Sequence, residues 1–190
     1  MSKIFIDHIS FLVKDLDQAR ADWAQLLGVL SPDHLMQVTE GEGADVQEGV
    51  RMKWCTFQNP DPTGVSIQLW TAAEPGTWVD KVLAKRGEYV HHVCFLSDDF
   101  DKMCSDLRDA DVPLLLDEPS NPDTMPWLKW NFVPTEKTHG TLLELATRYL
   151  PCGNRWVAHP DNVENLELGE EMRKRFAPNN AAAEAAADDA

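Results

Sequence analysis

Several marks of particular protein classes are scarce or missing in this chain of 190 residues. Its four cysteines lie far apart and form no Cys-x-x-Cys pair, so we expect reduced thiols. No stretch approaches the roughly 20 apolar residues of a membrane helix. Strand-like sequence begins directly after Met1, which leaves no room for a signal peptide. These absences predict a cytoplasmic protein without a membrane partner.

Basic residues are also scarce. The chain has 17 Lys and Arg against 32 Asp and Glu, which gives a formal net charge of −15. A chain this acidic is repelled by nucleic-acid phosphates and by anionic lipids, so we expect no nucleic acid as a partner. The hydrophobic share of 43% is ordinary for a soluble protein, and the length is sufficient for one compact core.

The chain does contain an internal repeat. The segment around His8 is echoed in the second half of the sequence by the segment around His92. The aligned pairs are His8 with His92, Phe11 with Phe95, Leu12 with Leu96, Asp15 with Asp99 and Asp17 with Asp101. Self-similarity of this kind predicts a duplicated structural unit. Each unit places a histidine at the same point of a strand.

Each half of the repeat predicts the order β-α-β-β-β. After the strand of His8 or His92 comes a helix, capped by Asp15 or Asp17 in the first half and by Asp99 or Asp101 in the second. Gly28 is expected to end the first helix. The further strands are expected at residues 35–38, 50–57 and 65–70, and at 113–116, 127–133 and 141–146. A linker helix at about 75–85 joins the halves.

We therefore predict an α+β fold in which two βαβββ modules form a curved mixed sheet around a metal-binding cleft. The modules span residues 4–72 and 88–149 of a single domain at residues 1–150. Residues 151–176 are expected to form a C-terminal appendage, amphipathic at 163–175. Residues 177–190 are an Ala/Asp/Glu low-complexity tail.

Four polar residues are the candidate metal ligands. If His8 faces the cleft, the repeat predicts that His92 faces it too. The closing strand of each half offers one polar inward candidate, Gln68 in the first and Glu144 in the second. A charge among leucines is costly to bury without a partner, and a metal ion would provide one. The set suits one Mn²⁺, Co²⁺, Ni²⁺, Fe²⁺ or Zn²⁺ ion with positions left for substrate.

These residues resemble the vicinal oxygen chelate superfamily of glyoxalases, bleomycin-resistance proteins and dioxygenases, over residues 4–149. The glutamine strand, the linker helix, the His91-His92 pair and the final glutamate strand are most similar to the methylmalonyl-CoA epimerase family. The resemblance implies that His8, Gln68, His92 and Glu144 bind a metal ion. It also implies a homodimer and a small-molecule substrate.

One departure from that family concerns its catalytic acid/base. A second glutamate of the epimerases falls on Met52 here, and a thioether cannot carry a proton. A slip of one residue would bring Arg51 or Lys53 to this place, and a desolvated lysine can serve in proton transfer. Glu144, Lys53 and the turn residue His139 are therefore the candidate catalytic residues.

The seven tryptophans are many for this length. Trp54, Trp70 and Trp130 lie on predicted strands, and Trp70 shares a face with Gln68 by the two-residue period. With Met52, these three form the candidate substrate-binding set and favour an apolar or aromatic substrate. By the same period, His91 is expected to face away from the cleft.

Three functional hypotheses remain open at this point. The first is a metal-dependent isomerase or epimerase that transfers a proton α to a carbonyl, as methylmalonyl-CoA epimerase does. The second is an Fe(II) extradiol-type dioxygenase or a glyoxalase-like lyase acting on an aromatic or apolar substrate. The third is a binding protein that sequesters its ligand without reaction.

Overall fold

The computed structural model describes residues 3–44, 50–61, 63–120, 127–152, 155–159 and 161–162. Its helices are α1 (Leu16–Leu30), the 3-10 helix η1 (Pro32–Leu35), α2 (Trp78–Arg86) and α3 (Phe100–Asp109). Its strands are β1 (Ile4–Leu12), β2 (Val38–Ala44), β3 (Arg51–Phe57), β4 (Ser66–Ala72), β5 (Tyr89–Ser97), β6 (Trp130–Val133), β7 (Leu142–Thr147), β8 (Tyr149–Cys152) and β9 (Arg155–Ala158).

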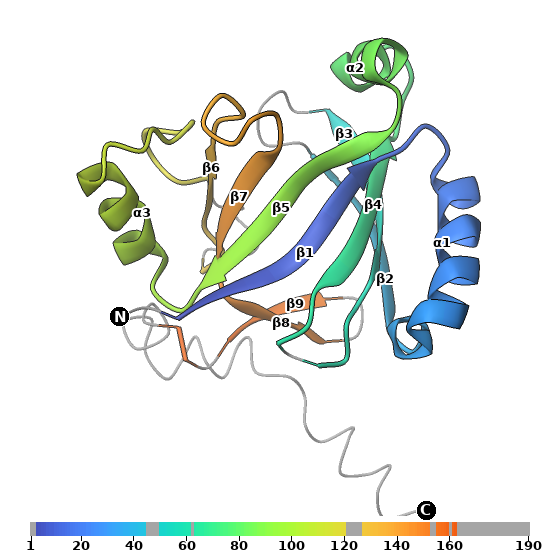
Figure 1. Ribbon diagram of the computed structural model, residues 1–190, viewed down its shortest axis with the longest axis horizontal. Coiled ribbons are helices and arrows are strands. Elements are labelled where there is room, and N and C mark those ends of the chain that lie inside the picture. Colours follow the sequence, from blue (N-terminus) through green and yellow to red (C-terminus); the bar gives the residue numbers. More distant parts are fainter. Residues whose placement is uncertain are drawn as a thin grey trace, which may run out of the picture.

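Seven of the strands form one curved, open sheet in the order β2-β3-β4-β1-β5-β7-β6 (Figure 1). The first strands of the two halves, β1 and β5, lie antiparallel at its centre. Each pairs in parallel with the last strand of its own half, β1 with β4 and β5 with β7. The predicted α+β class and the curved mixed sheet are confirmed.

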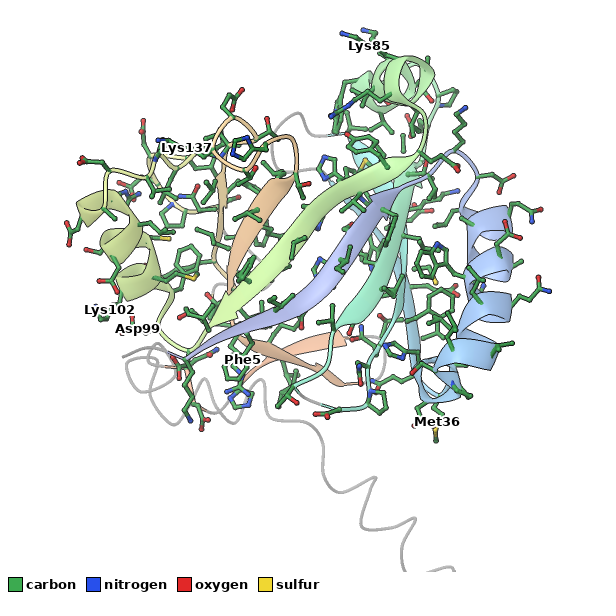
Figure 2. All side chains as sticks on the ribbon, in the orientation of Figure 1. Phe5, Met36, Lys85, Asp99, Lys102 and Lys137 are labelled. Atoms are coloured by element: carbon green, nitrogen blue, oxygen red, sulfur yellow. The ribbon has the colours of Figure 1, made fainter. Side chains whose placement is uncertain are left out.

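Aspartate caps begin the two long helices, as the sequence predicts. Asp15 accepts a hydrogen bond from the backbone N of Gln18 at the start of α1. Asp99 accepts one from the backbone N of Lys102 at the start of α3, where Figure 2 shows both side chains. Gly28, by contrast, does not end α1. The helix continues to Leu30 and its last turn closes on Ser31, so that prediction is wrong.

The helices α1 and α3 cover one face of the sheet, and the site lies on the other face. α1 packs on Leu69 and Phe57 of the first half, and α3 packs on Leu145 of the second half. Because side chains alternate along a strand, Gln68 and Trp70 then point to the opposite face. The shorter α2 closes the end of β4 and β5, where its Val79 packs against Trp70.

Two predicted strands differ from the described structure. The strand predicted at residues 35–38 lies later, as β2 (Val38–Ala44), because Pro32 starts a tight helix that ends at Leu35. In the second half, residues 113–116 run beside β6 without forming a ladder. Leu115 N donates to Phe132 O, but Leu116 N donates to the side-chain Oδ1 of Asn131. The described part of the second half is therefore β-α-β-β.

The predicted appendage at residues 151–176 falls only partly within the described structure. β8 and β9 form a hairpin directly after β7, and the buried Asn162 donates from Nδ2 to Arg148 O. The predicted amphipathic segment at 163–175 and the tail at 177–190 lie outside the described residues. The division at residue 150 stays a prediction. Within the part of the chain that is described, no helix has the length and apolar character needed to span a membrane.

Candidate metal centre

The inner face of the sheet lines a cavity of about 260 Å³. Its walls are mostly aromatic and apolar, and its polar groups gather where β1, β4, β5 and β7 meet. The lining residues include all eight predicted ligands and substrate-binding residues: His8, Met52, Trp54, Gln68, Trp70, His92, Trp130 and Glu144.

Three of these residues bring their donor atoms together at the centre of the sheet. His8 Nε2 lies 3.1 Å from His92 Nε2, and His92 Nε2 lies 3.1 Å from Glu144 Oε2. Both imidazoles are buried, and the ligand atoms of all three residues lie within 4.8 Å of one another. The central antiparallel pairing of β1 with β5 produces this meeting, because it sets the two histidine-bearing strands side by side.

This spacing fits a divalent metal ion. Two donor atoms at right angles, each about 2.1 Å from one ion, lie about 3.0 Å apart. The two separations of 3.1 Å, from His8 Nε2 to His92 Nε2 and from His92 Nε2 to Glu144 Oε2, match that value. Two imidazole nitrogens and one carboxylate oxygen are also a donor set that transition metals accept.

Gln68 lies beside this cluster on β4, next to Ser10 of β1. Ser10 Oγ donates a hydrogen bond of 2.8 Å to Gln68 Oε1, and this bond fixes the orientation of the amide. The carbonyl oxygen of Gln68 keeps a second lone pair, so the bond to Ser10 leaves it able to act as a ligand.

Both central strands carry an irregularity immediately before the ligand histidine. On β1 the pairing with β5 shifts between Ile6 and His8, so Asp7 is the extra residue. On β5 the shift falls opposite Ser10 and Phe11, so His91 is the extra residue. A bulge of this kind interrupts strict alternation and redirects a side chain.

The bulge overturns one expectation from the sequence. His91 does not face away from the cleft: it lines the cavity, and its Nδ1 lies 2.9 Å from His92 Nδ1. Asp7 has the equivalent position directly before His8, and its Oδ2 lies 2.7 Å from His8 Nδ1. Asp7 Oδ2 also accepts a 2.6 Å hydrogen bond from Tyr149 OH.

The pKa values of the three histidines and the glutamate at the site are shifted in different directions. Burial alone would lower the pKa of His8, but the hydrogen bond and charge of Asp7 outweigh it and raise this pKa. Burial, and then the neighbouring His8 and His91, hold the pKa of His92 well below its usual range. Burial, and then the charge of Arg86, lower the pKa of His91 to about 4. Burial raises the pKa of Glu144.

Two tryptophans of the cavity wall, Trp54 and Trp130, each lie opposite a small residue of the neighbouring strand. Trp54 pairs across the sheet with Gly41, where a Cβ atom would lie 2.5 Å from the indole ring. In the second half, Trp130 pairs with the buried Ala146. Met52 is only 6% exposed, and it belongs to an apolar cluster with Trp70.

Two predicted catalytic residues lie away from the cavity. Lys53 is exposed on the face of β3 opposite to Met52, and its Nζ lies 3.8 Å from Glu42 Oε1. Because strand neighbours face opposite sides, Met52 and Lys53 cannot both reach the cavity. His139 is exposed in the turn before β7, with a φ of 56°. Neither residue lines the cavity in which a substrate would bind.

Comparisons with known proteins identify the family of the chain. Residues 7–125 match the Glyoxalase/Bleomycin resistance protein/Dioxygenase superfamily. The chain belongs to this superfamily. No curated protein matches the sequence.

Several solved structures of the superfamily resemble the chain. A variant of Streptomyces coelicolor methylmalonyl-CoA epimerase, in complex with 2-nitronate-propionyl-CoA, is 31% identical with a TM-score of 0.57. That match covers 76% of this chain and 95% of the epimerase. Methylmalonyl-CoA epimerase from Mycobacterium tuberculosis is 24% identical with a TM-score of 0.57, over 77% of this chain and 89% of its own. The second likeness supports the fold alone.

Sequence reasoning missed four residues that the superfamily fold brings to the site: Asp7, Trp78, His91 and Tyr149. Asp7 and His91 had an available signal, since each directly precedes a ligand candidate in the repeat. Trp78 and Tyr149 had none, because they come from a helix start and from a strand beyond the repeat.

Proposed function

We propose that this protein is an enzyme that uses one divalent metal ion to move a proton at the carbon next to a carbonyl group. The observation that carries this proposal is the cluster of His8, His92 and Glu144 at the floor of an apolar cavity. Mn²⁺, Co²⁺, Ni²⁺, Fe²⁺ and Zn²⁺ all suit two imidazoles, a carboxylate and the Gln68 amide.

The structural relatives suggest the substrate class to test first. One similar structure is a methylmalonyl-CoA epimerase in complex with methylmalonyl-CoA, at 30% identity. We propose that this chain acts on an acyl thioester or a related carbonyl compound. The aromatic walls formed by Trp54, Trp70 and Trp130 favour an acyl group with an apolar or aromatic body.

When bound, the ion supplies a Lewis acid that polarises the carbonyl oxygen and stabilises negative charge on it. The residues of the chain do the remaining work. His8 and His92 hold the site, and the carboxylate of Glu144 removes the proton. Glu144 is suited to this task because its side chain is about one-fifth exposed and is poorly solvated there.

We further propose that the reaction uses a single base. Inversion at carbon requires proton carriers on both faces of the substrate. Met52 lines the cavity where the epimerase resemblance places a second glutamate, and its buried neighbours Leu12, Val79 and Leu83 are apolar. Glu144 is therefore expected to remove the proton from the α carbon and to deliver it to a neighbouring atom on the same face of the substrate, as in an isomerase.

Incubation with an acyl-CoA in D₂O, followed by mass spectrometry, tests the proposal. Protein loaded with Co²⁺ or Zn²⁺ should incorporate deuterium at the α carbon. Glu144→Gln should slow this exchange by about 10²- to 10⁴-fold, the usual contribution of a general base. Glu118→Gln, which changes an exposed carboxylate that does not line the cavity, should exchange normally. Absence of exchange with every metal and acyl-CoA tried would overturn the proposal.

A second function is favoured by the same three ligands. Two histidines and one carboxylate are the facial ligand set of Fe(II) oxygenases, and the aromatic walls suit a catechol ring. Oxygen uptake separates the two functions, because proton transfer consumes no O₂. Uptake that requires both Fe²⁺ and a catechol would favour the dioxygenase, and its absence would leave the isomerase as the better assignment.

A further inference from the structure

Each ligand histidine carries a partner on the nitrogen that faces away from the cluster. The two Nε2 atoms face each other at 3.1 Å, so in each ring Nδ1 is the remaining nitrogen. Asp7 Oδ2 occupies the Nδ1 side of His8 at 2.7 Å. His91 Nδ1 occupies the Nδ1 side of His92 at 2.9 Å.

The two partners are equivalent by position and different in chemistry. Both stand directly before the ligand histidine, at the bulge of a central strand. Asp7 offers a carboxylate. His91 offers a neutral ring, packed edge-on to Trp70 with ring centres 4.6 Å apart.

The hydrogen-bonding pattern fixes the tautomers. If Nε2 of each ligand histidine faces a metal ion, each Nδ1 carries the proton and donates. His8 then donates to the Asp7 carboxylate, and His92 donates to Nδ1 of His91. This leaves the proton of His91 on its Nε2. A charged acceptor makes the stronger hydrogen bond and the more basic ligand.

We propose that Asp7 and His91 are matched positioning residues, and that the neutral partner of His92 makes it the weaker of the two histidine ligands. This inference rests on the proposed metal site. The carboxylate of Asp7 orients and strengthens His8. His91 orients His92 without adding charge, and unlike Asp7 it also lines the cavity.

The test is binding of Co²⁺ alone to the full-length protein, with the dissociation constant and the visible absorption of the bound ion as readouts. Asp7→Asn keeps an acceptor but removes the charge, and should weaken Co²⁺ binding roughly 10- to 100-fold, the range typical of such partners. His91→Phe keeps the ring packing but removes the acceptor, and should weaken binding by a smaller factor and shift the absorption.

A replacement in the opposite direction sharpens the test. Because both bulges have the same register, an aspartate at position 91 should reach His92 as Asp7 reaches His8. His91→Asp is therefore expected to bind Co²⁺ at least as tightly as the unchanged protein. Tyr89→Phe serves as a packing control, since Tyr89 contacts His91 with ring centres 6.0 Å apart and does not touch the ligands.

The outcomes separate this inference from the proposed function. If the unchanged protein binds no Co²⁺, the metal site itself is wrong. If it binds Co²⁺ and His91→Phe leaves both the affinity and the spectrum unchanged, His91 has no positioning role. Thermal unfolding of the metal-free variants identifies any that fail to fold, and His91→Asn, which restores an acceptor, should recover the spectrum lost in His91→Phe.

Discussion

The two halves of the molecule build the site from the same four positions, three of which carry unlike residues. The histidines stand 84 residues apart, and the neighbouring positions correspond as well. The first half contributes Asp7, His8, Ser10 and Gln68, and the second contributes His91, His92, Cys94 and Glu144. Within each half the pairing is alike: Ser10 lies opposite Gln68, and Cys94 lies opposite Glu144.

The difference lies in where each half puts its negative charge. In the first half the carboxylate of Asp7 stands behind the histidine, and the group beside the proposed metal position is a neutral amide. In the second half the order is reversed, since neutral His91 stands behind His92 and the carboxylate of Glu144 is beside that position. Under the proposed function, the first half of the duplicated unit holds the ion and the second half also reacts.

The largest effect is expected when Gln68 and Glu144, on the last strand of each half, are exchanged. The double variant Gln68→Glu/Glu144→Gln keeps the composition of the ligand set but moves the proposed base to the first half. We expect Co²⁺ affinity within about ten-fold of normal, because the donor types are unchanged. We expect α-proton exchange to fall by at least about 10²-fold, because the base no longer stands over the substrate carbon.

Both quantities come from one preparation, by Co²⁺ titration and by deuterium incorporation. The single variant Gln68→Glu is the control for an added carboxylate near the ion. Full exchange activity in the double variant would show that the halves are interchangeable and would contradict the division of roles.

In metal-free protein, the two halves should also differ in how their histidines make stability depend on pH. His91 has its pKa lowered to about 4, by burial and then by Arg86, so the unfolded chain binds its proton first as pH falls. Its contribution to the free energy of unfolding is present above about pH 6.5 and is lost toward pH 4. The shift corresponds to at most about 3 kcal/mol.

The contribution of His8 should have the opposite sign. Burial opposes its protonation, but Asp7 prevails and raises its pKa, so its contribution is present below about pH 6.5 and is lost as pH rises. Urea unfolding in EDTA between pH 4.5 and pH 9 measures both. In the plot of unfolding free energy against pH, His91→Phe should reduce the slope on the acid side. Asp7→Asn should reduce the slope on the alkaline side. Parallel curves for the two variants would contradict this assignment.

A smaller effect is expected at the small residues beneath the aromatic walls. Gly41→Ala places a Cβ atom 2.5 Å from the ring of Trp54, which must then leave β2. We expect a loss of about 1–3 kcal/mol in unfolding free energy. Gly28→Ala is the matched control. Gly28 lies within α1, and its added Cβ atom would lie at an ordinary contact distance of 3.7 Å from Leu35. Because alanine favours a helix over glycine, the unfolding free energy of this variant should rise by about 0.5–1 kcal/mol. Urea unfolding at pH 7 measures both, and equal losses would show that Trp54 does not need Gly41.

Much of the fold could be predicted from the sequence because it depends on residues that are close together in the chain. The aspartate caps, the strand around each histidine and the repeat itself all follow from neighbouring residues. The predictions failed where a longer context decides. Gly28 looked like a helix end, but Ser31 closes the helix one turn later. Residues 113–116 looked like a strand, but Asn131 takes one of their backbone hydrogen bonds.

The site was readable for a similar reason, with one instructive exception. Period-two alternation placed Gln68 and Trp70 correctly on one face of β4. The same rule placed His91 outside, because alternation assumes an unbroken ladder and β5 carries a bulge at that residue. A bulge depends on the partner strand, so the alternation of residues within β5 alone does not predict it. Lys53 and His139 were candidates by residue type alone, and their exposure follows from pairing and turn geometry.

The central position of β1 also affects how the chain folds as it is synthesised. β1 leaves the ribosome before both of its partners, because one of its edges pairs with β4 and the other with β5, which come later in the chain. Until residues 89–97 emerge, the half-built sheet exposes an unpaired edge that could recruit another chain. The charged, bulged Asp7 interrupts this edge and makes it a poor template. The residue that supports His8 in the finished protein would thus also protect the nascent one.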